Sequence, residues 1–233
     1  MTRDALAALR AAADPAKAAE MAVYHKAPRT YLGVPNPVID ALVADWRASL
    51  DVRGRLALAR GLWDSDIHEA RIAAAKLLTQ ARIREHEPEI WSELARWVPS
   101  FDGWATADHA SKAIERRLTA VPDRLDAVEA WTRDPSMWVR RAALVATLPW
   151  SKLTHPTAAE IAARERILGW AAGYVADRDW FIQKAVGWWL RSLAPHDPDR
   201  VRAFLAGPGA ALKPFARREA ARRLAAAPAE AQL

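Results

Sequence analysis

The groups that could do chemistry in this chain are carboxylates, aromatic rings and cations. Its 233 residues include no cysteine, which excludes thiolate nucleophiles, thiolate metal ligands and disulfides. The six histidines are scattered, and the run His68-Glu-Ala-Arg71 lacks the second histidine of an HExxH zinc motif. Neither GxSxG nor a glycine-rich nucleotide-binding motif is present. We therefore expect no metal and no cofactor.

Two pairs of such residues have helical spacing. Trp104 and Asp108 are four residues apart, and Trp138 and Arg141 are three apart, so a helix would bring each pair to one face. Each pair has a plainer interpretation. Trp104 could lie at the edge of the core beside a solvated Asp108, and Trp138 could be a packing residue beside a surface arginine.

The run DRDWFIQKAVGWWLR, residues 177–191, contains two adjacent tryptophans. Successive helical residues point about 100° apart, so the two rings cannot share one direction. An apolar stripe is formed by Ile182, Val186, Trp189, Leu190 and Leu193, which predicts that Trp189 is in the core. Lys184, Trp188 and Arg191 form a second stripe, suited either to a phosphodiester backbone with a sugar or base against the ring or to a local cation–π cluster without function.

The elements that must position these residues are helices. Proline and glycine separate segments with a helical hydrophobic period, and no segment alternates like a strand. The expected helices cover residues 3–13, 15–27, 37–50, 51–63, 66–84, 88–98, 104–119, 122–132, 136–148, 156–176, 179–193, 197–206 and 213–226. Proline should occupy the first helical position in three of them, at Pro15, Pro37 and Pro156. The chain is thus predicted to be all-α.

Several helices open in a similar way, which indicates repeats. The openings are Asp64, Asp102, Asp134 and Asp177, a spacing typical of stacked helix pairs. DPSMWVRRAA, residues 134–143, resembles the HEAT-repeat signature. A HEAT-like solenoid is therefore favoured over a closed helical bundle. The second helices, which carry Arg71, Arg141 and Lys184, would line its concave basic surface.

Composition bounds the remaining possibilities. The net charge is +6 and the pI near 10, which suits a polyanionic partner. Twelve tryptophans exceed the needs of a core this size, so some should lie on a recognition surface. No apolar stretch approaches a transmembrane length, and the N-terminus lacks a signal-peptide pattern. We expect a cytoplasmic monomer with one domain over residues 1–233, a helical cap at 1–20 and a flexible tail at about 225–233.

Several motifs together resemble the DNA alkylation repair family, the AlkD-type DNA glycosylases. FIQKAVGWWLR (181–191) resembles the family's FIQKAxGWxLR segment. Further matches, in order, are MAVYHK (21–26), YLGVPNP (31–37), DIHEARIAAAKLL (66–78), WATAD (104–108), WVRRAAL (138–144) and RREAAR (217–222). The resemblance spans about residues 21–223. It departs from the family at His25, where a methionine is usual, and at Ala105, where an aspartate is usual.

The resemblance implies that HEAT-like repeats hold duplex DNA in a concave basic groove and excise N3- and N7-alkylated purines. It implies engagement from the backbone side, without a deep base pocket. It assigns roles residue by residue: Asp108 as the catalytic aspartate, Trp104 and Trp188 as aromatics flanking the lesion sugar, Arg141 as a DNA contact beside them, and Tyr24 and Arg191 as backbone contacts. We add Lys184, on the stripe of Trp188, as a DNA-binding residue.

The residues present are consistent with that chemistry. A purine alkylated at N3 or N7 is cationic and leaves as a neutral base, so no general acid is needed. A carboxylate can stabilise the oxocarbenium-like sugar and orient water, and aromatic faces attract the cation. The sequence thus predicts a monofunctional alkylpurine DNA glycosylase acting in the cytoplasm, on the nucleoid. Two alternatives remain: an inactive relative that binds damaged or branched DNA through the same groove, and a helical-repeat protein scaffold.

Overall fold

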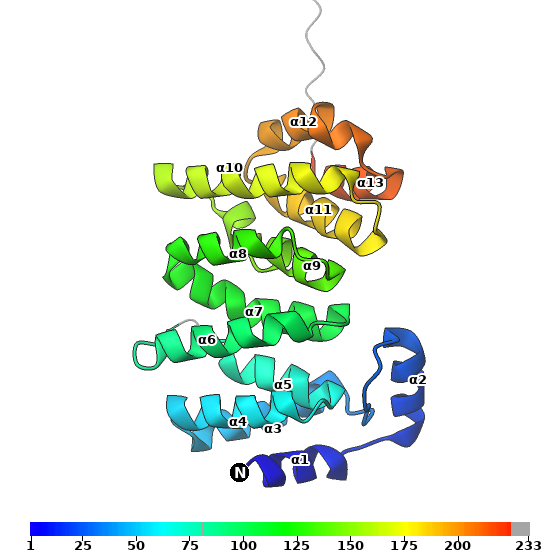
Figure 1. Ribbon diagram of the computed structural model, residues 1–233, viewed down its shortest axis with the longest axis vertical. Helices are drawn as coiled ribbons and strands as arrows, with labels where there is room; N and C mark the ends of the chain where they lie inside the picture. Colours follow the sequence, from blue (N-terminus) through cyan, green and yellow to red (C-terminus); the bar gives the residue numbers. More distant parts are fainter. Residues whose placement is uncertain (81, 225–233) are drawn as a thin grey trace, which may run out of the picture. The chain divides into compact units, whose positions relative to one another are not determined.

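The computed structural model describes residues 1–80 and 82–224, and these residues fold into helices (Figure 1). The α-helices are α1 (Thr2–Ala11), α2 (Pro15–His25), α3 (Asn36–Ser49), α4 (Val52–Asp64), α5 (His68–Leu78), α6 (Glu87–Trp97), α7 (Trp104–Ala120), α8 (Leu125–Trp131), α9 (Met137–Val145), α10 (Ala158–Gly173), α11 (Trp180–Leu193), α12 (Pro198–Ala206) and α13 (Pro214–Ala221). Short 3-10 turns follow several of them, including η3 (Leu148–Lys152) and η4 (Tyr174–Ala176). Within the described residues the only β pairing is a single bridge between Thr30 and Ile67. The all-α prediction is confirmed.

Local chemistry explains where the helices begin. Asp14 caps α2 by accepting hydrogen bonds from the N–H groups of Ala16 and Lys17, and Pro15 follows at the first helical position, as predicted. The helix expected from residue 156 begins later, at Ala158, because Thr157 and Glu160 form a capping box there. The helix expected from residue 66 also begins later, because Asp66 has a left-handed φ of 55°.

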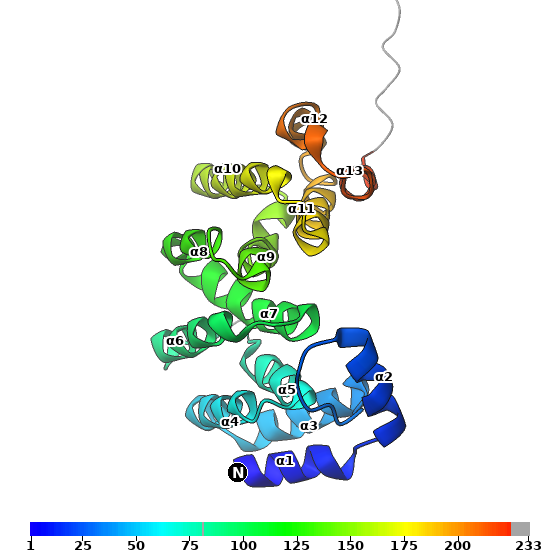
Figure 2. The same cartoon turned by 45° about the vertical axis from the view of Figure 1, so that its right-hand side comes forward.

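The chain divides into two compact units, residues 1–126 and 127–233. In the first, α5 packs against α3, α4 and α7, and α6 packs against α7. Figure 2 shows α4 and α6 on one side of this unit and α5 and α7 on the other. The side chains of α5 are almost all buried, which makes this helix the centre of the unit's core. The N-terminal cap predicted for residues 1–20 contains α1, which packs on α4, and the start of α2.

In the second unit α11 occupies the centre and packs against α9, α12 and α13. Its predicted apolar stripe is confirmed, since Ile182, Val186, Trp189, Leu190 and Leu193 are all 0% exposed. In Figure 2 α8 and α10 lie on one side of this unit and α9 and α11 on the other. In each unit these helices form two layers, an arrangement typical of helical-repeat proteins. The single domain and the concave basic surface stay predictions, and the tail at 225–233 lies outside the described residues.

No helix among the described residues is long and apolar enough to cross a membrane.

Candidate active site

The first unit contributes Trp104 and Asp108, both at the N-terminal end of α7. Gly103 precedes the helix in an extended conformation, and Trp104 is the first helical residue. Four residues later, Asp108 lies one turn along the same face, and both side chains are partly exposed. Their neighbours Ala105, Thr106 and Ala107 are buried, so α7 presents one accessible stripe here, as the spacing predicted.

Trp104 belongs to a connected group of five aromatic rings, four of them from three other segments, and we call this group the Trp104 cluster. It consists of Tyr24, His25, Tyr31, His68 and Trp104. The centroid of the Trp104 ring is 5.3 Å from that of His25 and 6.0 Å from that of Tyr24, which meets it edge-on at 87°. Tyr24 is 69% exposed, so this predicted DNA-binding residue is accessible beside Trp104.

Two imidazoles lie at the base of the cluster. The rings of His25 and His68 have centroids 4.5 Å apart. The Nδ1 atom of each is buried and has no hydrogen-bond partner among the residues that the structure describes. Burial lowers the pKa of His25, and it lowers the pKa of His68 to about 3, with further lowering by nearby His25 and Arg29. Both imidazoles are therefore neutral at physiological pH, so His25 contacts Trp104 by packing rather than by charge.

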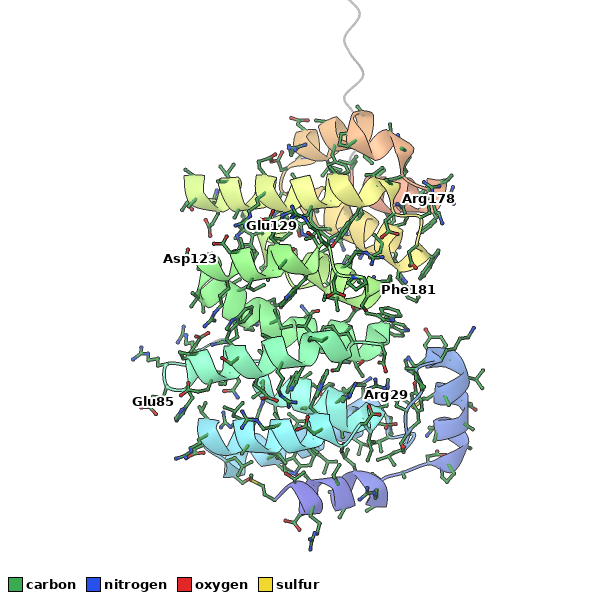
Figure 3. All side chains as sticks on the ribbon, viewed as in Figure 1. Arg29, Glu85, Asp123, Glu129, Arg178 and Phe181 are labelled. Atoms are coloured by element: carbon green, nitrogen blue, oxygen red, sulfur yellow. The ribbon has the colours of Figure 1, made fainter. Side chains whose placement is uncertain are left out.

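A buried arginine holds the start of α7 against the segment after α2. The side chain of Arg29 is 1% exposed and forms an ion pair with Asp102, two residues before Trp104. Its Nη1 atom is 3.7 Å from a carboxylate oxygen of Asp66, which also pairs with Arg71. In Figure 3 the label of Arg29 lies between α2 and the end of α5. This ion-pair clamp was not predicted, because its residues are far apart along the chain.

Arg71 has a structural role rather than the exposed position expected from its place in the repeat. It is 9% exposed, and its guanidinium donates hydrogen bonds to the carbonyls of Trp63 and Ser100. It also lies over the Trp63 ring, 4.8 Å from the centroid. Arg71 therefore joins α5 to α4 and to the turn before α7.

The second unit contributes Trp188 and Arg141, which the structure brings together. Trp188 is partly exposed whereas Trp189 is fully buried, which confirms the predicted division between the two. The guanidinium carbon of Arg141 is 6.0 Å from the centroid of the Trp188 ring. Arg141 is only 3% exposed, and its Nη1 atom donates to the carbonyl of Phe181 at 3.0 Å. The interaction of Arg141 with DNA stays a prediction.

The two cations expected on either side of Trp188 interact with other side chains. Lys184 is exposed, and its Nζ atom is 4.6 Å from the ring centroid of Trp180. Arg191 forms an ion pair with Glu219 on α13. Sequence reasoning missed Trp180 and Glu219 as partners. For Trp180 the signal was its position four residues before Lys184, while Glu219 could be found only from the packing of α13 on α11.

A row of aromatic side chains lies at the start of α11. Phe181, labelled in Figure 3, has its ring centroid 4.6 Å from that of Trp138 and 4.9 Å from that of Trp180. Trp138 therefore packs on Phe181, which matches the plainer interpretation of the Trp138 and Arg141 pair. Arg140, turned away from this face, pairs with Asp177 at 3.0 Å.

Within residues 1–80 and 82–224, no group of three or more histidine, aspartate or glutamate residues could hold a metal ion.

Comparisons with known proteins identify a family from the sequence and similar folds among solved structures. A sequence model described as DNA alkylation repair enzyme matches residues 5–224. A protein described as a predicted DNA alkylation repair enzyme from Enterococcus faecalis has a similar structure, with a TM-score of 0.74 and 23% identity over 92% of this chain and 98% of that one. AlkD2 from Streptococcus mutans gives a TM-score of 0.57 and 18% identity over 82% of this chain and 99% of that one. The smu.31 structure from Streptococcus mutans UA159 gives 0.59 and 19% over 80% and 92%. A comparison with curated proteins gave no significant match.

Proposed function

This chain belongs to the DNA alkylation repair enzyme family, and from that premise we propose that it is a monofunctional DNA glycosylase. Membership supports a role in repairing alkylation damage, with DNA as the substrate. The proposed reaction is hydrolysis of the N-glycosidic bond of N3- and N7-alkylated purines in duplex DNA. The products are a free alkylated base and an abasic site.

The observation that carries the proposal is the accessible Trp104–Asp108 stripe on α7. A purine alkylated at N3 or N7 carries a positive charge and departs as a neutral base, so the enzyme need not protonate it. The positive charge then passes to the sugar as the bond breaks. We assign Asp108 to stabilise that charge and to orient the attacking water. The face of Trp104 adds attraction to the same cation.

The two histidines of the Trp104 cluster suit this role because they are neutral. His25, which packs against Trp104, and His68, which packs against His25, are uncharged at physiological pH, since burial lowers the pKa of both. They therefore do not repel a positively charged sugar. Tyr24 meets the Trp104 ring edge-on and is exposed, so we assign it to a contact with the DNA backbone.

The second unit is assigned to holding the DNA. Trp188 is partly exposed and lies beside the guanidinium of Arg141, an arrangement suited to a sugar and its adjacent phosphate. Lys184 is exposed and adds a positive charge on the same helix. Arg191 pairs with Glu219, so a phosphate contact by Arg191 would have to compete with that carboxylate.

The test is release of base from duplex DNA that contains 7-methylguanine. Asp108→Asn should lower the single-turnover rate by about 100-fold or more, the usual cost of losing one electrostatic stabiliser of a transition state. Its affinity for the duplex should be kept. Asp123→Asn is the matched control, because Asp123 is an exposed carboxylate of the same unit beyond the far end of α7 (Figure 3).

Other outcomes would point to the alternative functions. Tight DNA binding with no base release by the wild-type protein would favour an inactive relative that recognises damaged or branched DNA. Absent DNA affinity, or affinity independent of salt, would favour a protein scaffold, because contacts with phosphates must weaken as salt rises.

A further inference from the structure

An open cleft of about 340 Å³ lies among α3, α5 and α7 in the first unit. Both ribbon views place α5 between α3 and α7, and α5 packs on each of them (Figures 1 and 2). The polar side chains that line the cleft are Asp40 and Arg47 from α3, Lys76 from α5, Thr79 just after α5, and His109 and Lys112 from α7. We call it the α3–α5–α7 cleft.

The charge of this cleft is positive. Three cations line it against one lining carboxylate, Asp40, and when Glu115, the partner of Lys112, is counted as well the net charge is +1 (three minus two). His109 adds no charge at physiological pH, because burial first and Lys76 second lower its pKa to about 4. Its neutral imidazole remains able to donate or accept a hydrogen bond. The cleft therefore suits an anion with several acceptor oxygens.

The cations are held in position by protein groups before any ligand arrives. The Nζ atom of Lys76 is 2.5 Å from a carboxylate oxygen of Asp40, and that of Lys112 is 3.1 Å from one of Glu115. Arg47 donates to the backbone carbonyls of Lys76 and Thr79. Its Nε atom is buried and has no partner among the described residues. Restrained cations lose less conformational entropy on binding than free ones do.

The cleft continues the proposed catalytic stripe. Lys112 is four residues after Asp108, so it lies about one turn, or roughly 6 Å, further along the same face of α7. Neighbouring phosphates on a DNA strand are separated by a distance of the same order. A strand whose sugar contacted Trp104 and Asp108 could thus place a nearby phosphate at Lys112.

We propose that the α3–α5–α7 cleft binds a phosphodiester group of the duplex, with Lys76 and Lys112 as its main cationic contacts. This assignment rests on the proposed function, which makes DNA the ligand. It gives the first unit an anchor for the DNA backbone that is separate from Tyr24 and from every residue of the second unit.

The experiment measures the affinity for an undamaged duplex as a function of salt. One phosphate contact contributes a slope of about 0.9 in log K against log salt, so it accounts for about a 3.5-fold change between about 50 and 200 mM. The double variant Lys76→Gln, Lys112→Gln removes the cationic contacts with that one phosphodiester, so between those salt concentrations its affinity should fall about 3.5-fold less than that of the wild type, and its binding at low salt should be weaker. Asp40→Asn should change the low-salt affinity in the opposite direction, because it removes the cleft's carboxylate.

Arg53→Gln is the matched control. Arg53 is an exposed cation on α4, outside the cleft, and its substitution removes a positive charge from the same unit. It should leave the salt slope unchanged. A double variant with the slope of Arg53→Gln would overturn the proposal. A reduced slope in a protein whose wild type releases no 7-methylguanine would keep the cleft assignment while refuting the glycosylase.

Discussion

Removing the ring of Trp189 should destabilise the protein strongly, whereas removing the ring of Trp188 should not. Trp189 is 0% exposed on the central helix of the second unit. A buried tryptophan covers about 150–250 Å², and at about 25 cal/mol per Å² this corresponds to about 4–6 kcal/mol of transfer free energy. Measured substitutions of buried aromatic residues by alanine cost about 3–5 kcal/mol. We expect Trp189→Ala to fall in that range.

The hydrogen bond of Trp189 adds little to this figure. Its indole N–H donates to the carbonyl of Thr147 at 3.4 Å, which is long for such a bond. That carbonyl also accepts the backbone N–H of Trp150 at 3.1 Å, so it would keep a partner in the variant. The loss of packing therefore accounts for nearly all of the expected change.

Trp188→Ala is the matched control, because it removes the same atoms from the adjacent residue. Part of the Trp188 ring is already in contact with solvent, so we expect a loss of no more than about 2 kcal/mol in the free energy of unfolding. Urea unfolding followed by far-ultraviolet circular dichroism measures both variants against wild type. Equal losses, or a larger loss for Trp188→Ala, would refute the assignment of the two rings to core and surface.

Three further predictions concern the first unit. Because the folded-state pKa of His68 is about 3 and its unfolded value about 6.5, the unfolded state binds the extra proton between these values. The free energy of unfolding should therefore fall as pH drops through that window, by up to about 1.4 kcal/mol per pH unit, and His68→Gln should flatten the slope measured by urea unfolding. Gly33→Ala should destabilise by more than about 1 kcal/mol, because φ is +78° and a Cβ would lie 2.1 Å from the carbonyl of Asp14; a thermal midpoint equal to that of wild type would contradict this. His25→Met should be neutral or stabilising by about 1 kcal/mol, because it removes a buried nitrogen without a partner while keeping an apolar contact with Trp104, and a clear loss in urea unfolding would show that this nitrogen is satisfied.

Helical periodicity predicted most of the fold because the apolar positions alone determine which face of a helix is buried. The stripe of α11 shows this, since every residue assigned to it is fully buried. The errors occur at helix ends, where a few side chains decide the outcome. The capping box of Thr157 and Glu160 and the left-handed Asp66 each place the start of a helix two residues later than predicted. Neither feature can be detected from the spacing of apolar residues.

Which side chains of the candidate site are accessible was predictable where the residues share one helix. Trp104 with Asp108 and Trp188 with Trp189 were placed correctly, because both pairs depend only on helical geometry. Contacts between helices were not predictable. The pairing of Arg191 with Glu219 and the clamp of Arg29 on Asp102 join residues far apart in the sequence, and a single sequence contains no signal for such pairs.

The two candidate aromatic residues have different electrostatic surroundings, and this separates their expected roles. The guanidinium carbon of Arg141 lies 6.0 Å from the centroid of the Trp188 ring. A cation on the opposite face of that ring would lie about 10 Å from the guanidinium, where repulsion amounts to roughly 2 kcal/mol at an effective dielectric constant of about 20. This repulsion offsets the cation–π attraction of about 0.5–2 kcal/mol that the ring offers.

The imidazole that packs against Trp104, that of His25, is neutral at physiological pH and adds no such repulsion. A positively charged sugar should therefore be stabilised by Trp104, whereas the expected contact of Trp188 is with a neutral sugar or a phosphate of the DNA. An interaction made only in the transition state affects the chemical step, and one made equally in both states affects binding. We thus expect Trp104→Ala to lower the single-turnover rate at saturating protein, and Trp188→Ala mainly to weaken DNA binding. A lower single-turnover rate for Trp188→Ala, with only weaker binding for Trp104→Ala, would show that the charge of Arg141 does not prevent Trp188 from stabilising a positively charged sugar.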